Sequence, residues 1–252
     1  MEPCRTPAVV IGVRTYGEYD KIVTFYSLNR GRMSGIAKGA QRSLKRFLNK
    51  LELFTQLEII YTNSRSSSLV MIDQAELIDP LPLIRANYER YTAAALICEL
   101  TLHWTRENDP DPGIFELLIW ALGNLEDMNR PASWGVIIFQ IKMLTLLGYK
   151  PELSGCTECG AINRESAPFR FSTTRNGMVC NKCRRSDGQG PPGLPFSLDT
   201  AAFLLKAQEM PLDKIKRLHF TPKVVKEAIA ILKIYGTSIL QRDITAWDFL
   251  VK

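Results

Sequence analysis

The stretch PAVVIGVRTYGEYDKIVTFYSLNRGRMSGIAKG, residues 7–39, decides the fold of this chain. It contains three short runs rich in β-branched and aromatic residues, which are separated by the connections YGEYD and NRG. Runs of this kind, bounded by glycine and polar residues, are typical of β-strands. LFTQLEIIYT (residues 53–62) and SSLVMIDQAEL (residues 67–77) continue the pattern, so the sequence predicts five strands before residue 80.

Five short strands with no helix between them predict a small barrel or sandwich. We expect a five-stranded β-barrel of the OB type, because that architecture suits a segment of this length. The stretch DPLPL, residues 79–83, ends the β region, since its two prolines do not fit within a central strand. Residues 1–80 are therefore predicted to form one domain.

The remaining residues, 81–252, are predicted to form a helical domain, which makes the chain an α+β protein of two domains. Residues 83–106 are expected to form one long and largely buried helix. Later helices are expected to begin at residues whose side chains cap free backbone N–H groups: Asp111, Ser197 and Thr221. In the last helix, the apolar spacing predicts one buried face: Val225, Ala228, Ile229, Leu232 and Ile239.

Four of the six cysteines form two C-x2-C pairs with twenty residues between them: Cys156, Cys159, Cys180 and Cys183. They lie in a predicted loop at about residues 150–195, and a loop of that length needs something to order it. The spacing matches a tetrahedral four-cysteine zinc site. Two disulfides, a redox pair or an iron–sulfur cluster are the alternatives. Gly160 and Gly177 are expected to supply flexible backbone near the sulfur atoms.

The sequence has no motif that argues for catalysis. It contains no GxxxxGK[ST] phosphate loop, no GxGxxG after a strand, and no GxSxG or HExxH motif. A four-cysteine site leaves no open position for a reacting water, so the zinc is expected to be structural and the chain not to be an enzyme. No signal peptide and no apolar run of about 18 residues is visible, so we expect a cytoplasmic protein.

Positive charge is concentrated near the start of the chain, whose formal net charge is +6. Between Asp20 and Glu52 there are eight Lys and Arg residues and no acid. A patch of this kind attracts polyanions and releases counterions when it binds phosphates. A solvated loop is the plainer explanation, but the segregation of charge favours nucleic-acid binding by residues 1–80. The predicted contacts are Lys38, Arg42, Arg32, Lys45, Arg46 and Lys50.

Aromatic residues accompany the basic run, as in OB barrels that stack the bases of single strands. They are Tyr16, Tyr19, Phe25, Tyr26 and Phe47. Phe25 and Tyr26 are successive residues of one strand and point to opposite faces, so at least one is expected in the core. Phe47 is expected to pack against the protein.

Two segments together resemble RecO, the bacterial family of DNA repair and recombination mediators. One is YGEYDKIVTFYSLNRGRMSGIAKGAQR, residues 16–42, which ends in a run similar to the family's AKGARR. The other is LGYKPELSGCTECG, residues 147–160, with GMVCNKC, residues 177–183. Lys38 and Arg42 match the family run, whereas Gln41 stands where the family more often has arginine.

The resemblance covers nearly the whole chain and implies an N-terminal OB domain, a helical C-terminal domain and one zinc ion in members that keep the four cysteines. It implies binding of single- and double-stranded DNA, annealing of complementary strands and loading of the RecA recombinase without ATP hydrolysis. The implied partners are RecR, RecF and single-strand binding protein, whose DNA substrates place the protein at the nucleoid. The resemblance also implies a role in the response to DNA damage.

Two other classes of function stay open on the residues alone. One is a zinc-ribbon adaptor that works through protein–protein contacts and has incidental DNA affinity. The other is a metal-dependent enzyme acting on nucleic acid, for which nothing in the sequence argues.

Overall fold

The computed structural model describes residues 2–43, 45–64, 67–127, 130–162, 168–186 and 193–250. Parts of the predicted zinc-binding loop, residues 163–167 and 187–192, lie outside the described residues. Contacts between Cα atoms divide the chain into two compact units, residues 1–132 with 248–252 and residues 133–247. Among the described helices, none has the length and apolar character needed to cross a bilayer.

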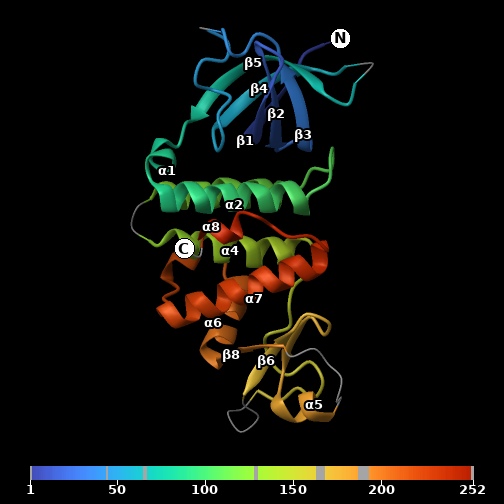
Figure 1. Ribbon diagram of the computed structural model, residues 1–252, viewed down its shortest axis with the longest axis vertical. Helices are drawn as coiled ribbons and strands as arrows, with labels where there is room; N and C mark the ends of the chain where they lie inside the picture. The colour runs from blue at the N-terminus through green and yellow to red at the C-terminus, as the bar shows by residue number, and fades with distance from the viewer. Residues whose placement is uncertain are drawn as a thin grey trace. The chain divides into compact units, whose positions relative to one another are not determined.

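The first unit contains a closed five-stranded barrel, as predicted (Figure 1). Its strands are β1 (Cys4–Tyr16), β2 (Asp20–Ser27), β3 (Gly31–Ala37), β4 (Gln56–Thr62) and β5 (Val70–Asp79). Their order around the barrel is β1-β2-β3-β5-β4, and β3 closes it by pairing in parallel with β5. The other pairs are antiparallel. The connection between β3 and β4 also supplies Ala40 and Leu51 to the barrel core.

The barrel core is built from side chains on the inner face of the strands, since successive side chains of a strand point to opposite faces. In β3, for example, Met33 and Ala37 are buried while Ile36 is only half-buried. Phe25 and Tyr26 are both fully buried, so the expectation that at least one lies in the core is confirmed. Phe47 is also buried, as predicted, and packs in the barrel cluster.

The helices of the first unit correct one prediction. Residues 83–106 are not one helix, because α1 (Pro82–Ala86) ends before α2 (Tyr88–Trp104) begins. Asn87 separates them with an extended backbone, and its side chain accepts a hydrogen bond from the backbone N–H of Arg90. Asparagine favours this N-cap conformation over a helix interior, which explains the break. The next helix is α3 (Pro112–Glu126), which begins at the predicted cap Asp111.

The later helices are α4 (Ala132–Leu146), α6 (Leu198–Glu209), α7 (Pro222–Leu240) and α8 (Trp247–Leu250), with a 3₁₀ turn η2 (Ile215–Arg217) between α6 and α7. Of these, α6 begins at the predicted cap Ser197 and α7 at the predicted cap Thr221. The predicted face of α7 is turned by about one position: the buried residues are Val224, Ala228, Ile231, Leu232, Tyr235 and Gly236. Tyr235 explains the shift, since its ring packs on Phe171 and its hydroxyl donates to the Tyr149 carbonyl (3.1 Å).

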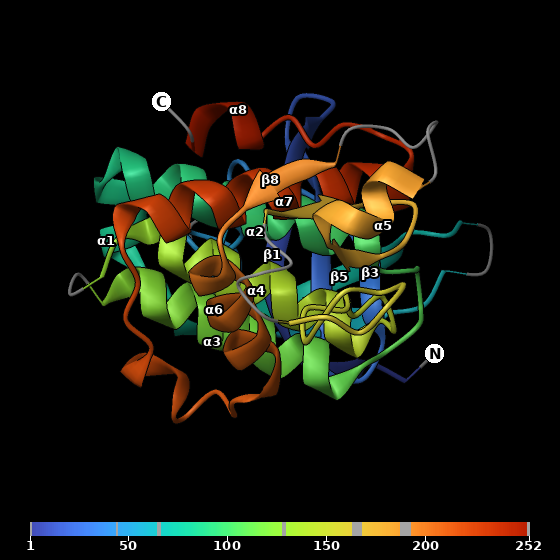
Figure 2. The same cartoon turned by 90° about the horizontal axis from the view of Figure 1, so that it is seen from below.

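The cysteine loop carries its own small sheet, which the sequence predicts only in part. The hairpin of β6 (Phe169–Ser172) and β7 (Gly177–Val179) was expected, whereas β8 (Leu194–Phe196) and α5 (Asn181–Ser186) were not. The strand order is β7-β6-β8, and α5 lies beside this sheet in both views (Figure 1, Figure 2). Gly177 does not serve as a flexible turn residue, because Asn176 takes the left-handed conformation (φ 51°). Gly177 is needed because any Cβ there would collide with the Glu152 carbonyl.

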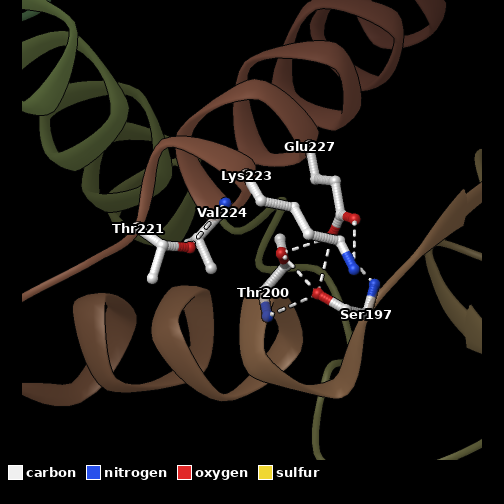
Figure 3. A network of polar contacts seen from close by, with 6 residues as sticks. All are labelled: Ser197, Thr200, Thr221, Lys223, Val224 and Glu227. Carbon is white, nitrogen blue, oxygen red and sulfur yellow. Dashed lines mark hydrogen bonds and ion pairs between the residues drawn. The ribbon is translucent and has the colours of Figure 1, made fainter.

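A carboxylate from α7 accepts hydrogen bonds from the start of α6 and holds it in place (Figure 3). Glu227 accepts hydrogen bonds from the backbone N–H of Ser197 (2.9 Å), the Ser197 hydroxyl (2.7 Å) and the Thr200 hydroxyl. Partial burial alone would raise the pKa of Glu227, but the hydrogen bonds from Thr200 and Ser197 outweigh it and lower the pKa below its ordinary value of 4.5. The negative charge also complements the positive end of the helix dipole.

We expect Glu227→Gln to lower the free energy of unfolding by roughly 1 to 2 kcal/mol at pH 7, because charged acceptors make the stronger hydrogen bonds. The folded-state pKa is the lower one, so this stability is present above about pH 4.5 and is lost as the pH falls through the folded-state value. Urea unfolding of the wild type and the variant at pH 7 measures the loss of stability, and the same comparison at pH 3 measures how much of the difference remains. Exposed Glu209→Gln, on the same pair of helices, is the control and should change little; equal losses in both variants would contradict the role of Glu227.

Candidate metal centre and nucleic-acid interface

The four cysteines of the two C-x2-C pairs meet in one place. Their sulfur atoms all lie within 4.8 Å of one another, and the Sγ atoms of Cys159 and Cys180 are 3.7 Å apart. All four are free thiols. Cys156 and Cys180 are buried, Cys183 is half-buried and Cys159 is exposed. We call these four residues the cysteine cluster.

Local backbone geometry brings the first pair together. Gly160 donates its N–H to the Cys156 carbonyl (2.8 Å) and has a φ of +71°, a left-handed conformation that glycine adopts without strain. This closes a tight turn in which both sulfur atoms point the same way. Thr157 donates its N–H to the Met178 carbonyl (2.8 Å), which attaches the turn to β7.

The second pair is placed by the change from strand to helix. Cys180 follows β7 directly, and Cys183 lies in the first turn of α5. The backbone N–H of Cys180 donates to the sulfur of Cys156 (3.3 Å), so the two pairs are joined across twenty-four residues of sequence. Successive main-chain N–H groups aimed at sulfur favour the thiolate form.

The electrostatics of the cluster suit a cation. Burial acts to raise the pKa of Cys156, but backbone N–H groups of Cys180, Cys159 and Glu158 outweigh it and lower the pKa to about 7. Hydrogen bonding with the sulfur atoms of Cys159 and Cys180 instead raises the pKa of Cys183 to about 12, because it favours the protonated Cys183 thiol. Four convergent sulfur ligands fit a divalent ion that prefers soft tetrahedral coordination.

The other two cysteines take no part in the cluster. Cys98 is buried in α2, and burial raises its thiol pKa well above the ordinary value. Cys4 is half-buried at the start of β1.

The predicted nucleic-acid contacts Lys38 and Arg42 lie on a turn directly after β3. Both side chains are exposed. The guanidinium of Arg42 lies over the ring of Tyr19, with its Cζ atom 3.3 Å from the ring centroid. Stacking of this kind holds the guanidinium plane while its N–H groups stay available for bidentate contacts with an anion.

Main-chain hydrogen bonds attach this turn to the connection between β1 and β2. Gly39 donates its N–H to the carboxylate of Asp20 (2.8 Å), and Gln41 donates its N–H to the Tyr19 carbonyl (3.0 Å). The Gln41 side chain donates to the Asp20 carbonyl (3.3 Å). The residue that departs from the family run thus helps to hold the turn in shape.

The other predicted contacts divide into two groups. Lys45 and Arg46 are exposed, and Arg46 donates to the Lys38 carbonyl (3.1 Å). Arg32 and Lys50 are engaged within the fold: Arg32 donates to the Thr105 carbonyl (3.1 Å) and lies 3.7 Å from the Glu107 carboxylate. Lys50 donates to the carbonyls of Ala75 (2.9 Å) and Lys45 (3.4 Å).

Sequence reasoning missed Arg14 and Tyr16 as a pair, because they precede the acid-free run. Both are exposed at the end of β1, beside the turn that carries Lys38 and Arg42. Strand alternation offers a signal for them, since Arg14 and Tyr16 are two positions apart in β1 and therefore share one face of the strand.

Comparison with known proteins covers nearly the whole chain. Residues 1–81 match the family model "Recombination protein O N terminal", and residues 85–247 match "Recombination protein O C terminal". Similar proteins, each named "DNA repair protein RecO", occur in several bacteria. The one from Syntrophus aciditrophicus is 30% identical over 98% of this chain and 94% of the relative. The one from Syntrophobacter fumaroxidans is 33% identical over 87% of this chain and 86% of the relative.

Proposed function

Because the chain belongs to the RecO family of DNA repair proteins, we propose that it is a recombination mediator that binds single- and double-stranded DNA and anneals complementary strands. The observation that carries the proposal is the exposed turn after β3. It presents Lys38 and an Arg42 guanidinium stacked on Tyr19 at one edge of the barrel, within a segment of eight positive charges and no acid.

The proposed mechanism uses charge and geometry. Lys38 supplies a mobile point charge for a phosphate, while the Tyr19 ring positions the planar guanidinium of Arg42 for two parallel hydrogen bonds. Neutralised phosphates repel one another less, so two bound strands can approach and pair. The exposed Lys45 and Arg46 add attraction around this turn.

The structure supports smaller roles for the other two predicted contacts. Arg32 and Lys50 already donate to backbone carbonyls of the protein, so their positive charges contribute to the field around the barrel more than to direct hydrogen bonds with DNA. We therefore rank Lys38 and Arg42 first among the predicted contacts.

The partners that we propose are RecA, RecR, RecF and single-strand binding protein, with the chain helping to load RecA onto coated single strands. It acts there through binding and without catalysis of its own. The place of action that follows from these substrates is the nucleoid, in the cytoplasm.

We propose that the cysteine cluster holds one structural zinc ion through Cys156, Cys159, Cys180 and Cys183. The support is the donor set, since four convergent thiols match the ligands of structural zinc. When bound, the ion would supply a cross-link between the turn that carries Cys156 and Cys159, Cys180 directly after β7, and Cys183 in α5.

Neutralising Lys38 and Arg42 together, as Lys38→Gln with Arg42→Gln, is expected to weaken single-strand binding and to flatten its salt dependence. Losing two phosphate contacts should reduce the slope of log K against log salt by roughly 1.4. Fluorescence anisotropy of a labelled oligonucleotide, titrated at several salt concentrations, measures the affinity and the slope together.

The matched control is Lys206→Gln with Lys226→Gln, which makes the same change of net charge at exposed residues of α6 and α7. It should leave the slope nearly unchanged. If both double variants bind DNA as the wild type does, the basic turn is not the DNA-binding site. A zinc-ribbon adaptor then becomes the better explanation of the chain's function.

A further inference from the structure

One row of outward-facing side chains runs straight across four strands of the barrel. Cross-strand register pairs Arg14 with Ile22, Ile22 with Ile36, and Ile36 with Met71. The adjacent residues Val23 and Val70 belong to the barrel core. Because side chains alternate between faces, the row lies on the outer face, and three of its four members are apolar.

This row forms part of a pocket of about 350 Å³. The residues that line it are Arg14, Tyr16, Ile22, Ile36, Ser64, Ser67, Leu69 and Met71. The apolar walls come from Ile22 on β2, Ile36 on β3 and Met71 on β5. Leu69, the residue directly before β5, adds to them. Arg14 and Tyr16 are exposed, and Tyr16 keeps 53% of its surface accessible. The volume is at the small end of ligand pockets, suited to one planar ring system.

We propose that this pocket receives an unpaired nucleobase of a bound single strand. The apolar walls and the Tyr16 ring suit the faces of a base, and the guanidinium of Arg14 can stack on it or bond its edge. Ser67 adds a hydroxyl to the lining, which suits the polar edge of a base. A purely apolar ligand would leave the Arg14 charge without a function.

The position of the pocket favours a nucleic acid over an apolar peptide as the occupant. Ile36 precedes Lys38 by two residues along the same strand end. Tyr16 pairs with Asp20, whose carboxylate binds the N–H of Gly39 in the basic turn (2.8 Å). The pocket and the proposed phosphate contacts therefore share one edge of the barrel, so one nucleotide strand can reach both.

The inference rests on the proposed DNA binding and adds a preference to it. A base within a duplex is stacked and paired, and it reaches a pocket only after it is flipped out of the helix. The pocket therefore favours single strands, whereas phosphate contacts alone would serve either form.

Two variants of Tyr16 test the proposal. Tyr16→Ala removes the stacking ring, and Tyr16→Phe keeps it; the high exposure of Tyr16 leaves the fold intact in both. The ligands are an oligothymidylate and an abasic strand of the same length and charge. We expect Tyr16→Ala to weaken oligothymidylate binding by roughly tenfold without changing the salt slope, and Tyr16→Phe to bind as the wild type does. Both variants should bind the abasic strand equally.

The wild type is expected to prefer the oligothymidylate over the abasic strand, and the variant Met71→Gln, which places a polar group in the pocket, should reduce this preference. If the wild type binds both strands equally and Tyr16→Ala changes nothing, the pocket proposal is overturned while DNA binding stands. An occupant such as an apolar peptide would give this result. If neither strand binds to the wild type, the proposed function and the pocket fall together.

Discussion

Replacing Cys159 by serine is expected to release the metal ion from the cysteine cluster and to unfold the loop around it. Cys159 is exposed, so the change from sulfur to oxygen costs almost nothing through packing. Its effect runs through the metal, because a neutral hydroxyl is a far poorer zinc ligand than a thiolate. Structural zinc sites contribute about 10 kcal/mol or more of binding free energy, which also stabilises the folded loop.

The measurement is metal analysis of purified protein, with limited proteolysis to locate the loss of structure. Wild type should contain about one zinc per chain and Cys159→Ser almost none. New cleavage sites should appear between Leu147 and Phe196, with the barrel strands protected. Chelation of the wild-type metal should give the same pattern.

Cys4→Ser is the matched control, since Cys4 lies outside the cluster on β1 and should keep the metal. A wild-type protein without metal that keeps its loop folded would contradict the structural-zinc proposal. The same holds if Cys159→Ser retains a full equivalent of zinc. A DNA-binding defect in Cys159→Ser is not expected from the barrel contacts, which lie in the other unit of the chain.

Removing the guanidinium of Arg90 is expected to give the largest loss of stability in the unit that contains the barrel. Arg90, on α2, is only 6% exposed. It donates to the carbonyls of Leu125 (2.6 Å), Asp127 (3.1 Å) and Arg130 (3.1 Å). These carbonyls lie at and beyond the end of α3, where helical partners are absent, so one side chain satisfies the acceptors that end a helix.

Arg90→Met keeps the length and the apolar stem of the side chain but leaves these carbonyls without their charged donor. We expect the free energy of unfolding to fall by roughly 3 kcal/mol or more, since each hydrogen bond from a charged donor is worth about 1.5 to 3 kcal/mol and an unpaired buried acceptor adds its desolvation cost. Urea unfolding followed by circular dichroism measures the change.

Arg106→Met controls for the loss of one positive charge, because Arg106 is exposed in the same unit, just beyond α2. Its effect should stay within about 0.5 kcal/mol. Arg90→Lys should behave more like Arg90→Met than like the wild type, since one ammonium does not span three carbonyls in the way that a planar guanidinium does. Equal stability of Arg90→Met and the wild type would show that water replaces the guanidinium at little cost.

The course of α2 illustrates where prediction from sequence stops. Apolar residues continue from Leu83 to Trp104, so periodicity predicts one helix, yet Asn87 starts a new one. A carboxylate at the end of α3 caps the preceding helix α1 separately: Glu126 accepts the N–H groups of Leu83 (2.9 Å) and Ile84 (3.0 Å). That cap joins residues over forty positions apart, which no local window of sequence contains.

The sequence by itself determined the five barrel strands, the helix caps at Asp111, Ser197 and Thr221, and the pairing of cysteines that could bind a metal. Each of these depends on short-range chemistry: alternation with a period of two, a side-chain oxygen within three residues of a free N–H, and two sulfur atoms on one tight turn. Each of these patterns lies within a few residues of sequence, so it can be recognised without knowledge of the rest of the fold.

The tertiary structure alone decided what each charge does. Eight similar cations lie between Asp20 and Glu52, but the fold gives Arg32 and Lys50 backbone partners and leaves Lys38 and Arg42 exposed. Register across four strands likewise joins Arg14 to Met71 in one row. Contacts of this kind depend on which strands become neighbours and in what register, and that is settled only when the whole chain closes on itself.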